Sequence, residues 1–343
     1  MIRPHQRILV IRNDKLGDFM LAWPALALLR ASALDAHIAV LVPAYTAPLA
    51  KICHFVDEVL IDPKLHGDWR NGRALANILR PKGFDAVVTL FSRFDTGLAV
   101  WLAGITYRLA PATKLAQLFY NHRLKQWRSE STKPEYEYNL DLIKQYLKDS
   151  DHQELPLPPP PYLHFDTTEI QRLAQDFRDK HGVGNSQHLV FVHAGHGGSA
   201  NNLSLAQYAE LIRGLQSRNG HYVVLTAGPD EEGQVQALSR LLTGIPHGVY
   251  ISQEGLVKFA MHLQFCDVFI SGSTGPLHVA AALNRNTAAF YPRRRSSTAL
   301  RWQTINDAER RIAFEPPAES RESDMQSIDM ASATAQISNK FLQ

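Results

Sequence analysis

The sequence predicts an α/β protein with two doubly wound domains. Short apolar runs alternate with longer helical segments along most of the 343 residues, as in parallel sheets covered by helices on both faces. A proline-rich run at 156–161 interrupts this alternation, as a stiff extended connector does. The length and a hydrophobic content of 45% are sufficient for two cores. We expect a first domain at 1–155, a linker at 156–163, a second domain at 164–322 and a final helix at 323–343.

Composition and charge limit the classes of protein to which this chain can belong. The net charge is only +3, which favours an acidic partner only where basic residues are concentrated. The two cysteines, Cys53 and Cys266, lie in apolar segments, so we expect no disulfide framework and a reducing compartment. No signal peptide precedes the first apolar run at Ile8, and the longest apolar run, 21–29, contains Pro24. We therefore expect a cytoplasmic protein whose membrane contact, if it has any, is peripheral.

The alternation of strands and helices can be followed along the chain. In the first domain we expect strands at 8–11, 37–42, 58–61, 84–91 and 105–109, and helices at 19–30, 45–53, 70–79, 96–103 and 134–148. In the second domain we expect strands at 189–192, 222–225, 249–251, 268–271 and 287–291, and helices at 168–181, 205–216, 232–242, 255–265 and 278–283.

A polar loop follows the first strand and ends in Asp18, next to the start of a helix. Ligands of open α/β sheets bind at the carboxyl ends of the strands, which is where this loop lies. Asp18 fits two roles at this position, an ordinary N-cap or a general base. Lys15, in the same loop, is either a solvated side chain or a cation that reaches a phosphate.

Two glycine-rich turns in the second domain predict an anion site. The turn 272–275 connects a buried strand to an alanine-rich helix with Pro276 in its first turn, and free backbone N–H groups at such a helix start bind anions. The turn 195–202 carries Gly195, Gly197 and Gly198, which allow an anion close to the backbone. His196 lies within this loop and His278 beside the other. An ordinary connecting turn is the alternative, and neither dinucleotide-binding nor Walker spacing is present.

The stretch 107–133 combines basic and aromatic side chains. Its cations outnumber its single acid, Glu130, and aromatic residues are interleaved with them. The basic residues are Arg108, Lys114, Arg123, Lys125, Arg128 and Lys133. Such a stretch suits phospholipid head groups or a phosphorylated glycolipid, and a solvated surface is the alternative. We expect no nucleic-acid partner, since no motif of that class accompanies it.

Metal-binding motifs have little support. The chain has neither a His-Glu-x-x-His nor a Cys-x-x-Cys pattern. Its one Asp-x-Asp sequence, Asp149–Asp151, lies at a helix end before the proline run and not after a buried strand. We therefore expect no metal.

Four motifs, in chain order, resemble glycosyltransferase family 9, the ADP-heptose:lipopolysaccharide heptosyltransferases. They are Ile8–Arg12 with Leu16–Asp18 and Pro24–Leu26, then Val192–Gly195, then Gly228–Glu231, and finally the segment from Gly275 to Ala282. The resemblance implies a GT-B fold of two Rossmann-like domains facing a central cleft. It also implies inverting, metal-independent transfer of a heptose or related sugar from a nucleotide diphosphate, with ADP-heptose the first choice. The acceptor would be the lipopolysaccharide core, at the cytoplasmic face of the inner membrane.

The resemblance also assigns roles to residues. Asp18 would be the catalytic base, Glu231 would lie near the nucleoside, and the final helix would cross back to the first domain. The donor-binding residues would be Gly195, His196, Gly197, Gly198, Ser199, Asn201, Ser273, Thr274, Gly275 and His278. For the acceptor we expect Lys15, Arg108, Arg123, Lys125 and Arg128. No cofactor besides the nucleotide-sugar co-substrate is expected.

Two positions depart from the family pattern. The family has a phosphate-binding Lys where this chain has Asn201, and an Asp where it has Ser273. Arg293 and Arg295, in the segment Arg293–Arg295, are expected to replace the missing positive charge. Two other functions stay open at this point: a nucleotide-sugar epimerase or hydrolase of the same fold, and a non-catalytic protein that binds anionic glycolipids.

Overall fold

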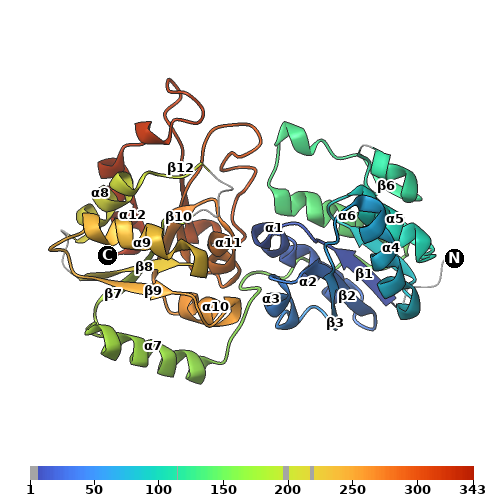
Figure 1. Ribbon diagram of the computed structural model, residues 1–343, viewed down its shortest axis with the longest axis horizontal. Coiled ribbons are helices and arrows are strands. Elements are labelled where there is room, and N and C mark those ends of the chain that lie inside the picture. Colours follow the sequence, from blue (N-terminus) through green and yellow to red (C-terminus); the bar gives the residue numbers. More distant parts are fainter. Residues whose placement is uncertain (1–6, 114, 196–200, 217–219) are drawn as a thin grey trace. The chain divides into compact units, whose positions relative to one another are not determined.

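The computed structural model describes residues 7–113, 115–195, 201–216 and 220–343. The chain forms two compact units (Figure 1): Met1–Arg128 with Thr132–Pro159, and Ser129–Ser131 with Pro160–Gln343. The main boundary between the two units falls between Pro159 and Pro160, inside the proline run. On the second unit, the backbone N–H groups of Tyr162 and Leu163 both donate to the carbonyl oxygen of Ala282, at 2.8 and 3.0 Å.

The first unit contains a six-stranded sheet with the order β3-β2-β1-β4-β5-β6, and every registered pair is parallel. The strands are β1 (Arg7–Ile11), β2 (His37–Pro43), β3 (Glu58–Asp62), β4 (Ala86–Thr89), β5 (Tyr107–Pro111) and β6 (His122–Leu124). The helices are α1 (Leu16–Met20), α2 (Trp23–Ser32), α3 (Ala47–Lys51), α4 (Asp68–Leu79), α5 (Phe94–Leu102) and α6 (Glu135–Asp149), with 3-10 turns η1 (Arg80–Lys82), η2 (Leu115–Phe119) and η3 (Arg128–Glu130).

The second unit repeats this topology. Its six strands are ordered β12-β11-β10-β7-β8-β9, which is the order of the first sheet read from the other edge. The strands are β7 (His188–His193), β8 (His221–Ala227), β9 (His247–Ile251), β10 (Val268–Gly272), β11 (Asn286–Phe290) and β12 (Arg311–Phe314). The helices are α7 (Thr167–His181), α8 (Leu205–Gln216), α9 (Glu232–Leu241), α10 (Leu256–Gln264), α11 (Gly275–Ala282) and α12 (Met330–Phe341), with 3-10 turns η4 (Pro229–Glu231), η5 (Ala308–Arg310) and η6 (Met325–Ser327).

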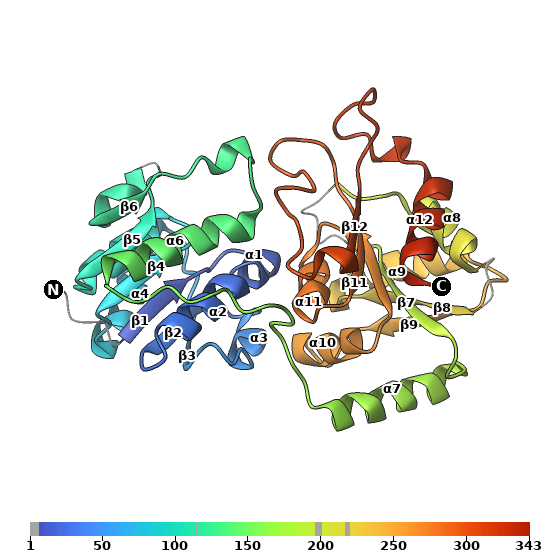
Figure 2. The ribbon, with the colours of Figure 1, turned by 180° about the vertical axis from the view of Figure 1, so that it is seen from behind.

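Apolar runs form the central strands because these strands are buried on both faces. In β1, Leu9 and Ile11 belong to the core under α4 and α5, and the intervening Val10 is equally buried. Figures 1 and 2 show α4 and α5 on one face of the first sheet and α2 and α6 on the other. Gly72 lets α4 and α5 pack closely, since a Cβ at this position would come within 2.8 Å of Leu98 Cδ2.

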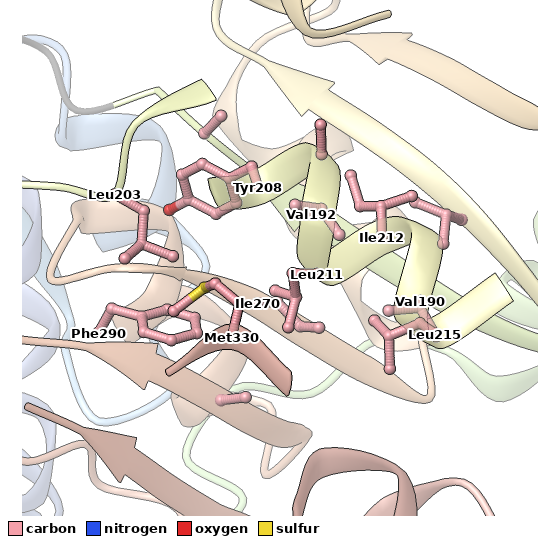
Figure 3. Close-up of a cluster of buried hydrophobic side chains, with 14 of the residues drawn as sticks. Val190, Val192, Leu203, Tyr208, Leu211, Ile212, Leu215, Ile270, Phe290 and Met330 are labelled. Carbon is pink, nitrogen blue, oxygen red and sulfur yellow. The ribbon is translucent and has the colours of Figure 1, made fainter. Parts of the chain in front are cut away.

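The last helix packs on the second unit, and its expected return to the first unit stays a prediction. Met330, Ala333 and Ile337 of α12 are buried in the core that α8 also covers. Figure 3 shows Met330 in this core with Leu211 of α8. A Cβ on Gly214 of α8 would lie 2.8 Å from Thr334 Cγ2, so this glycine permits the close helix contact. The apolar face of α12 is therefore satisfied within its own unit. The segment expected as one helix from 323 also contains η6 before α12 begins.

Other departures concern short elements. The helix expected at 19–30 is divided into α1 and α2, and Pro24 lies in the first turn of α2. The edge strands β6 and β12 were not expected. Both are short, and their first residues are only partly buried, so they lack the continuous apolar run that marks a central strand.

Candidate active site

Three candidate site residues follow strands that flank the reversal of strand order in the two sheets. In the first sheet the order reverses between β1 and β4, and in the second between β7 and β10. In open α/β sheets, ligands bind beyond the carboxyl ends of the strands at such a switch point. The loop after β1 leads to Asp18, and the loops after β7 and β10 contain Gly195 and Thr274. Asp18, Gly195 and Thr274 therefore follow strands at which each topology favours a ligand.

In the first unit, Asp18 is held by the buried Arg12. Asp18 is the third residue of α1, and its Oδ1 lies 2.6 Å from Arg12 Nη2. The Asp18 side chain is 13% exposed while that of Arg12 is 2% exposed, so the carboxylate reaches solvent and its partner does not. The ring of Phe91, from the loop after β4, lies 5.8 Å from the Arg12 guanidinium carbon. Both strands at the switch point thus contribute to the environment of Asp18.

Arg12 also binds other acids. Its Nε lies 3.0 Å from Asp14 Oδ1, and its Nη1 lies 3.2 Å from Glu135 Oε1 and 3.0 Å from Asn139 Oδ1. Glu135 and Asn139 belong to α6, which is distant in sequence: Glu135 lies 123 positions after Arg12. Glu135 and Asn139 were not among the predicted site residues. An arginine directly after a buried strand was the available signal.

The charges around Asp18 do not balance. Arg128 Nη1 lies 2.6 Å from the same oxygen of Glu135, so two guanidinium groups serve the carboxylates of Asp14, Asp18 and Glu135. Burial raises the pKa of Asp18 to about 6, and Asp14 and Glu135 add to this rise although Arg12 opposes it. A carboxyl group with a pKa near the working pH is suited to accept a proton.

In the second unit, Glu231 closes over Gly195. A Cβ placed on Gly195 would lie 2.2 to 2.4 Å from the carboxylate atoms of Glu231, so any larger residue there would have to displace this carboxylate. The Glu231 carboxylate accepts a hydrogen bond from the backbone N–H of Gly228 at 2.9 Å and lies 3.4 Å from His193 Nε2. Burial lowers the pKa of His193, and Glu231 opposes this effect. The sequence predicted Gly195 and Glu231 as separate binding residues, and the structure brings them together.

The start of α11 carries buried polar atoms that have no hydrogen-bond partner among the described residues. Thr274 is the N-cap residue, yet its buried Oγ1 makes no hydrogen bond with any residue that the structure describes. The same holds within the described chain for Nδ1 of His278, four positions later. Burial lowers the pKa of His278 to about 4, so its ring is neutral at pH 7. Unpaired buried polar groups at a helix N-terminus are a feature of sites that a ligand completes.

Asn202 connects the two loops of this site. Its Nδ2 donates to the carbonyl oxygen of Ala194 at 2.8 Å, and its Oδ1 accepts from Tyr208 Oη at 2.7 Å. A Cβ on Gly272, the last residue of β10, would lie 2.5 Å from Asn202 Oδ1. Asn202 therefore lies against both the loop after β7 and the end of β10. Asn202 was not among the predicted site residues.

The other donor-binding predictions have varied positions. His196, Gly197, Gly198 and Ser199 lie outside the described residues. Asn201 is exposed, whereas Ser273 and Gly275 are partly buried. Arg293 Nη2 donates to the carbonyl oxygens of Ala318 and Ser320, which favours a structural role for this arginine. Arg295 forms an exposed ion pair of 3.1 Å with Glu130 of the same unit.

The predicted acceptor residues divide into two groups. Lys15, Arg123 and Lys125 are exposed, and Lys125 Nζ lies 4.5 Å from the ring centre of Trp127. Arg108 and Arg128 need correction, because neither side chain belongs to a solvated basic surface. The Arg108 guanidinium donates to the carbonyl oxygens of Ile105 and Phe119, and Arg128 binds the buried Glu135. The stretch 107–133 is therefore not one continuous basic patch.

The described residues contain no cluster of three or more histidine, cysteine or acidic side chains arranged to hold a metal ion. Within the same described ranges, no helix combines the length and the apolar character that crossing a membrane requires.

Comparison with known proteins identifies the family of this chain. The model of "Glycosyltransferase family 9 (heptosyltransferase)" matches residues 72–328, which is well over half of the chain. This chain belongs to glycosyltransferase family 9. A Haemophilus influenzae protein named "Putative glycosyltransferase" is 46% identical to this family 9 chain over 335 residues. The match covers 97% of this chain and 96% of the relative. This chain is 26% identical over 292 residues to lipopolysaccharide heptosyltransferase 2 of Escherichia coli, covering 83% and 82% of the two chains.

Solved structures confirm the GT-B fold of this glycosyltransferase. A family 9 glycosyl transferase from Veillonella parvula has a TM-score of 0.79 at 18% identity, covering 99% of this chain and 98% of that one. E. coli ADP-heptose lps heptosyltransferase II also has a TM-score of 0.79, at 21% identity, covering 98% and 99%. Family membership makes this protein a sugar-transferring enzyme, so the epimerase, hydrolase and non-catalytic alternatives lose their support.

Proposed function

We propose that this glycosyltransferase moves a heptose from ADP-heptose to a lipopolysaccharide core acceptor with inversion at the anomeric carbon. In this mechanism, Asp18 removes the proton from the acceptor hydroxyl while its oxygen attacks the anomeric carbon. The bond to the nucleotide diphosphate breaks in the same displacement, which inverts the configuration. No metal takes part.

The observation that carries this proposal is the environment of Asp18. Its carboxylate follows a strand at the switch point, is mostly buried and retains some exposure to solvent. Its pKa of about 6 leaves it ionised at pH 7 and still basic enough to accept a proton. Arg12 holds it in a fixed position at 2.6 Å. A residue serving only as an N-cap needs neither the burial nor this partner.

The second unit supports binding of a diphosphate. Leaving-group charge is stabilised by backbone N–H groups and by a helix N-terminus. The loop after β7 includes Gly195, and α11 begins beside Oγ1 of Thr274, which has no hydrogen-bond partner in the part of the chain that the structure describes. One relative is a lipopolysaccharide heptosyltransferase, and one solved neighbour, at a TM-score of 0.72, is E. coli heptosyltransferase WaaC with ADP. These likenesses are the reason to propose an adenine nucleotide and a lipopolysaccharide acceptor here.

A lipopolysaccharide core acceptor is attached to lipid. We therefore propose that the enzyme works in the cytoplasm, at the inner-membrane surface, as a peripheral protein. The exposed Lys15, Arg123 and Lys125 are the proposed contacts with acceptor phosphates.

The test is a transfer assay with defined donors. Purified enzyme is incubated with ADP-heptose, or with UDP-, GDP- or CMP-linked sugars, and a heptose-deficient core acceptor, in the presence and absence of EDTA. We expect a product only with ADP-heptose, no loss with EDTA, and an anomeric configuration opposite to that of the donor by NMR.

Three results would contradict parts of this proposal. Transfer from another nucleotide sugar alone would replace the donor, and a retained configuration would exclude a single displacement. Loss of activity with EDTA, restored by Mg²⁺, would show that a metal takes part.

A further inference from the structure

We propose that the face formed by α4, α5 and η2 of the first unit binds the surface of an anionic phospholipid bilayer. This face is the surface through which the proposed peripheral membrane contact would be made. Its binding to lipid rests on the proposed function only for its biological purpose, not for its physical basis. The residues of this face, called the aromatic face below, are Trp69, Arg70, Arg73, Phe94, Trp101, Leu115, Leu118 and Phe119.

Large apolar side chains are exposed on this face. Trp69 is 60% exposed and Trp101 is 53% exposed, while Leu115 and Leu118 in η2 are 72% and 73% exposed. In the second unit, the large apolar side chains that the structure describes as exposed are isolated Leu and Val residues with at most 46% exposure. Single exposed apolar residues are ordinary, but a continuous cluster marks an interaction surface.

The cluster is continuous because its rings contact one another. Phe94 lies 5.6 Å from Trp69 and 5.2 Å from Phe119, and Phe119 lies 6.2 Å from Trp101, measured between ring centres. Glycine makes this packing possible. A Cβ on Gly97 of α5 would lie 2.9 Å from Phe119 Cδ2, so the absence of a side chain there lets η2 lie directly on α5. The aromatic face is thus a fixed feature of the fold (Figure 1 shows α4 and α5 side by side).

The charges of this face are complementary to an anionic surface. Arg70 and Arg73 on α4 are exposed, and no ion pair with a described residue holds either of them. The acids on α4 and α5 are Asp68 and Asp95, and Asp95 is buried and paired with Arg93. η2 carries no charge. Tryptophan and leucine beside arginine are the side chains that insert at a membrane interface and attract anionic lipids.

The position of the face also fits a lipid-linked acceptor. Trp69 and Phe94 lie in the first turns of α4 and α5, which follow β3 and β4. In a parallel sheet these helix starts lie at the carboxyl ends of the strands, the same edge as Asp18. The end of the aromatic face that carries Trp69 and Phe94 therefore lies at the same edge of the sheet as Asp18, whereas Trp101 lies in the last turn of α5.

The experiment is flotation of the full-length enzyme with vesicles, without donor or acceptor, so that its outcome is independent of catalysis. Vesicles contain phosphatidylglycerol and phosphatidylcholine, or phosphatidylcholine alone. We expect the wild-type protein to bind the anionic vesicles. The double variant Trp101→Ser with Leu118→Ser should bind at least about tenfold more weakly. Arg70→Gln and Arg73→Gln should each weaken binding about fivefold, with the effect reduced at high salt.

The matched control is Leu241→Ser with Leu300→Ser, which removes two exposed leucines from the second unit and should bind like the wild type. Equal binding by the Trp101→Ser, Leu118→Ser variant would overturn the proposal. So would a loss of binding confined to Arg123→Gln with Lys125→Gln, which would assign the membrane to the neighbouring basic residues. Self-association without vesicles that Trp101→Ser abolishes would identify a second copy of the chain as the occupant. Vesicle binding without any sugar transfer would leave this inference standing and reject the proposed function.

Discussion

The two sheets have the same strand order and carry opposite chemistry at their carboxyl ends. In the first unit, the loop after β1 is charged, and Arg12 is shared among Asp14, Asp18 and Glu135. In the second, the loops after β7 and β10 contain glycines, and polar atoms of Thr274 and His278 lack partners among the described residues. The comparison teaches that a saturated charge network positions a reactive carboxylate, whereas small residues and polar atoms without a described partner leave room for an anion. One fold therefore supplies a base in one unit and a donor site in the other.

The largest expected effect is on the chemical step in the first unit. Asp18→Asn preserves the size of the side chain and its contact with Arg12 but cannot accept a proton. We expect kcat to fall by about 10²- to 10⁴-fold, while donor affinity measured by calorimetry is unchanged. Asp14→Asn, which also removes an acidic partner of Arg12, is the matched control and should lower kcat less than about tenfold. Similar losses in the two variants would mean that the charge network, and not the base, limits turnover.

The next largest expected effect is on the free energy of unfolding, when the same charge network is broken. Arg12→Leu leaves three carboxylates near one another with Arg128 as the remaining nearby cation, so we expect unfolding to become easier by about 3–5 kcal/mol. Lys144→Leu in α6 breaks an exposed ion pair with Glu154 and should cost less than about 1 kcal/mol. Urea unfolding measures both changes. An equally small cost for Arg12→Leu would show that the buried network contributes little.

A smaller effect is expected at the glycine loop of the second unit. In Gly195→Ala, the new methyl group must displace the Glu231 carboxylate, since the two would otherwise lie closer than 2.5 Å. We expect donor affinity to fall about tenfold or more, with little change in the pH dependence of turnover. Gly233→Ala is the control, because a Cβ there meets nothing within 4 Å and alanine favours the helix α9. Calorimetric titration with ADP separates the two variants, and unchanged affinity in Gly195→Ala would remove this loop from the donor site.

The smallest expected effect is that the free energy of unfolding depends on pH in opposite directions in the two units. The folded-state pKa of Asp18, about 6, is above its ordinary 3.8, so the native state loses stability as pH rises between these values. The pKa of His278, about 4, is below its ordinary 6.5, so stability at this group is lost as pH falls from 6.5 toward 4. We expect Asp18→Asn to gain stability relative to the wild type as pH rises, and His278→Asn to weaken the loss on the acid side.

Urea unfolding at steps between pH 4 and 7, with peptide-level hydrogen exchange to assign each transition to a unit, measures these slopes. Parallel slopes in the two variants would reject the distinction between the units.

The sequence was sufficient for the parts of the molecule that depend on local pattern. Continuous apolar runs predicted the central strands, and the proline run predicted where the main boundary between the units falls. Asp18 could be selected because a polar loop after a buried strand has a known position in this fold class. Edge strands such as β6 lack that pattern, and the destination of α12 depends on the fit of Thr334 against Gly214, which no local signal describes.

Relationships between distant residues could not be read from the sequence. Glu135 reaches Arg12 only because α6 packs beside α2, and nothing near Glu135 in the chain indicates a buried acid. Arg108 and Arg128 have the charge expected of a surface patch. The Arg108 side chain instead donates to the carbonyl oxygen of Phe119, and Arg128 pairs with the buried carboxylate of Glu135. Charge type could be predicted, whereas the partner that neutralises each charge depends on tertiary packing.

The central claim, that Asp18 is the base, is tested most directly by the pH dependence of kcat/KM for wild-type transfer with limiting acceptor. Only ionised Asp18 can accept the proton, so kcat/KM should rise tenfold for each pH unit below about 6 and level off above it. A profile that is flat from pH 5 to pH 8, or one that rises only above pH 8, would contradict the assignment of Asp18.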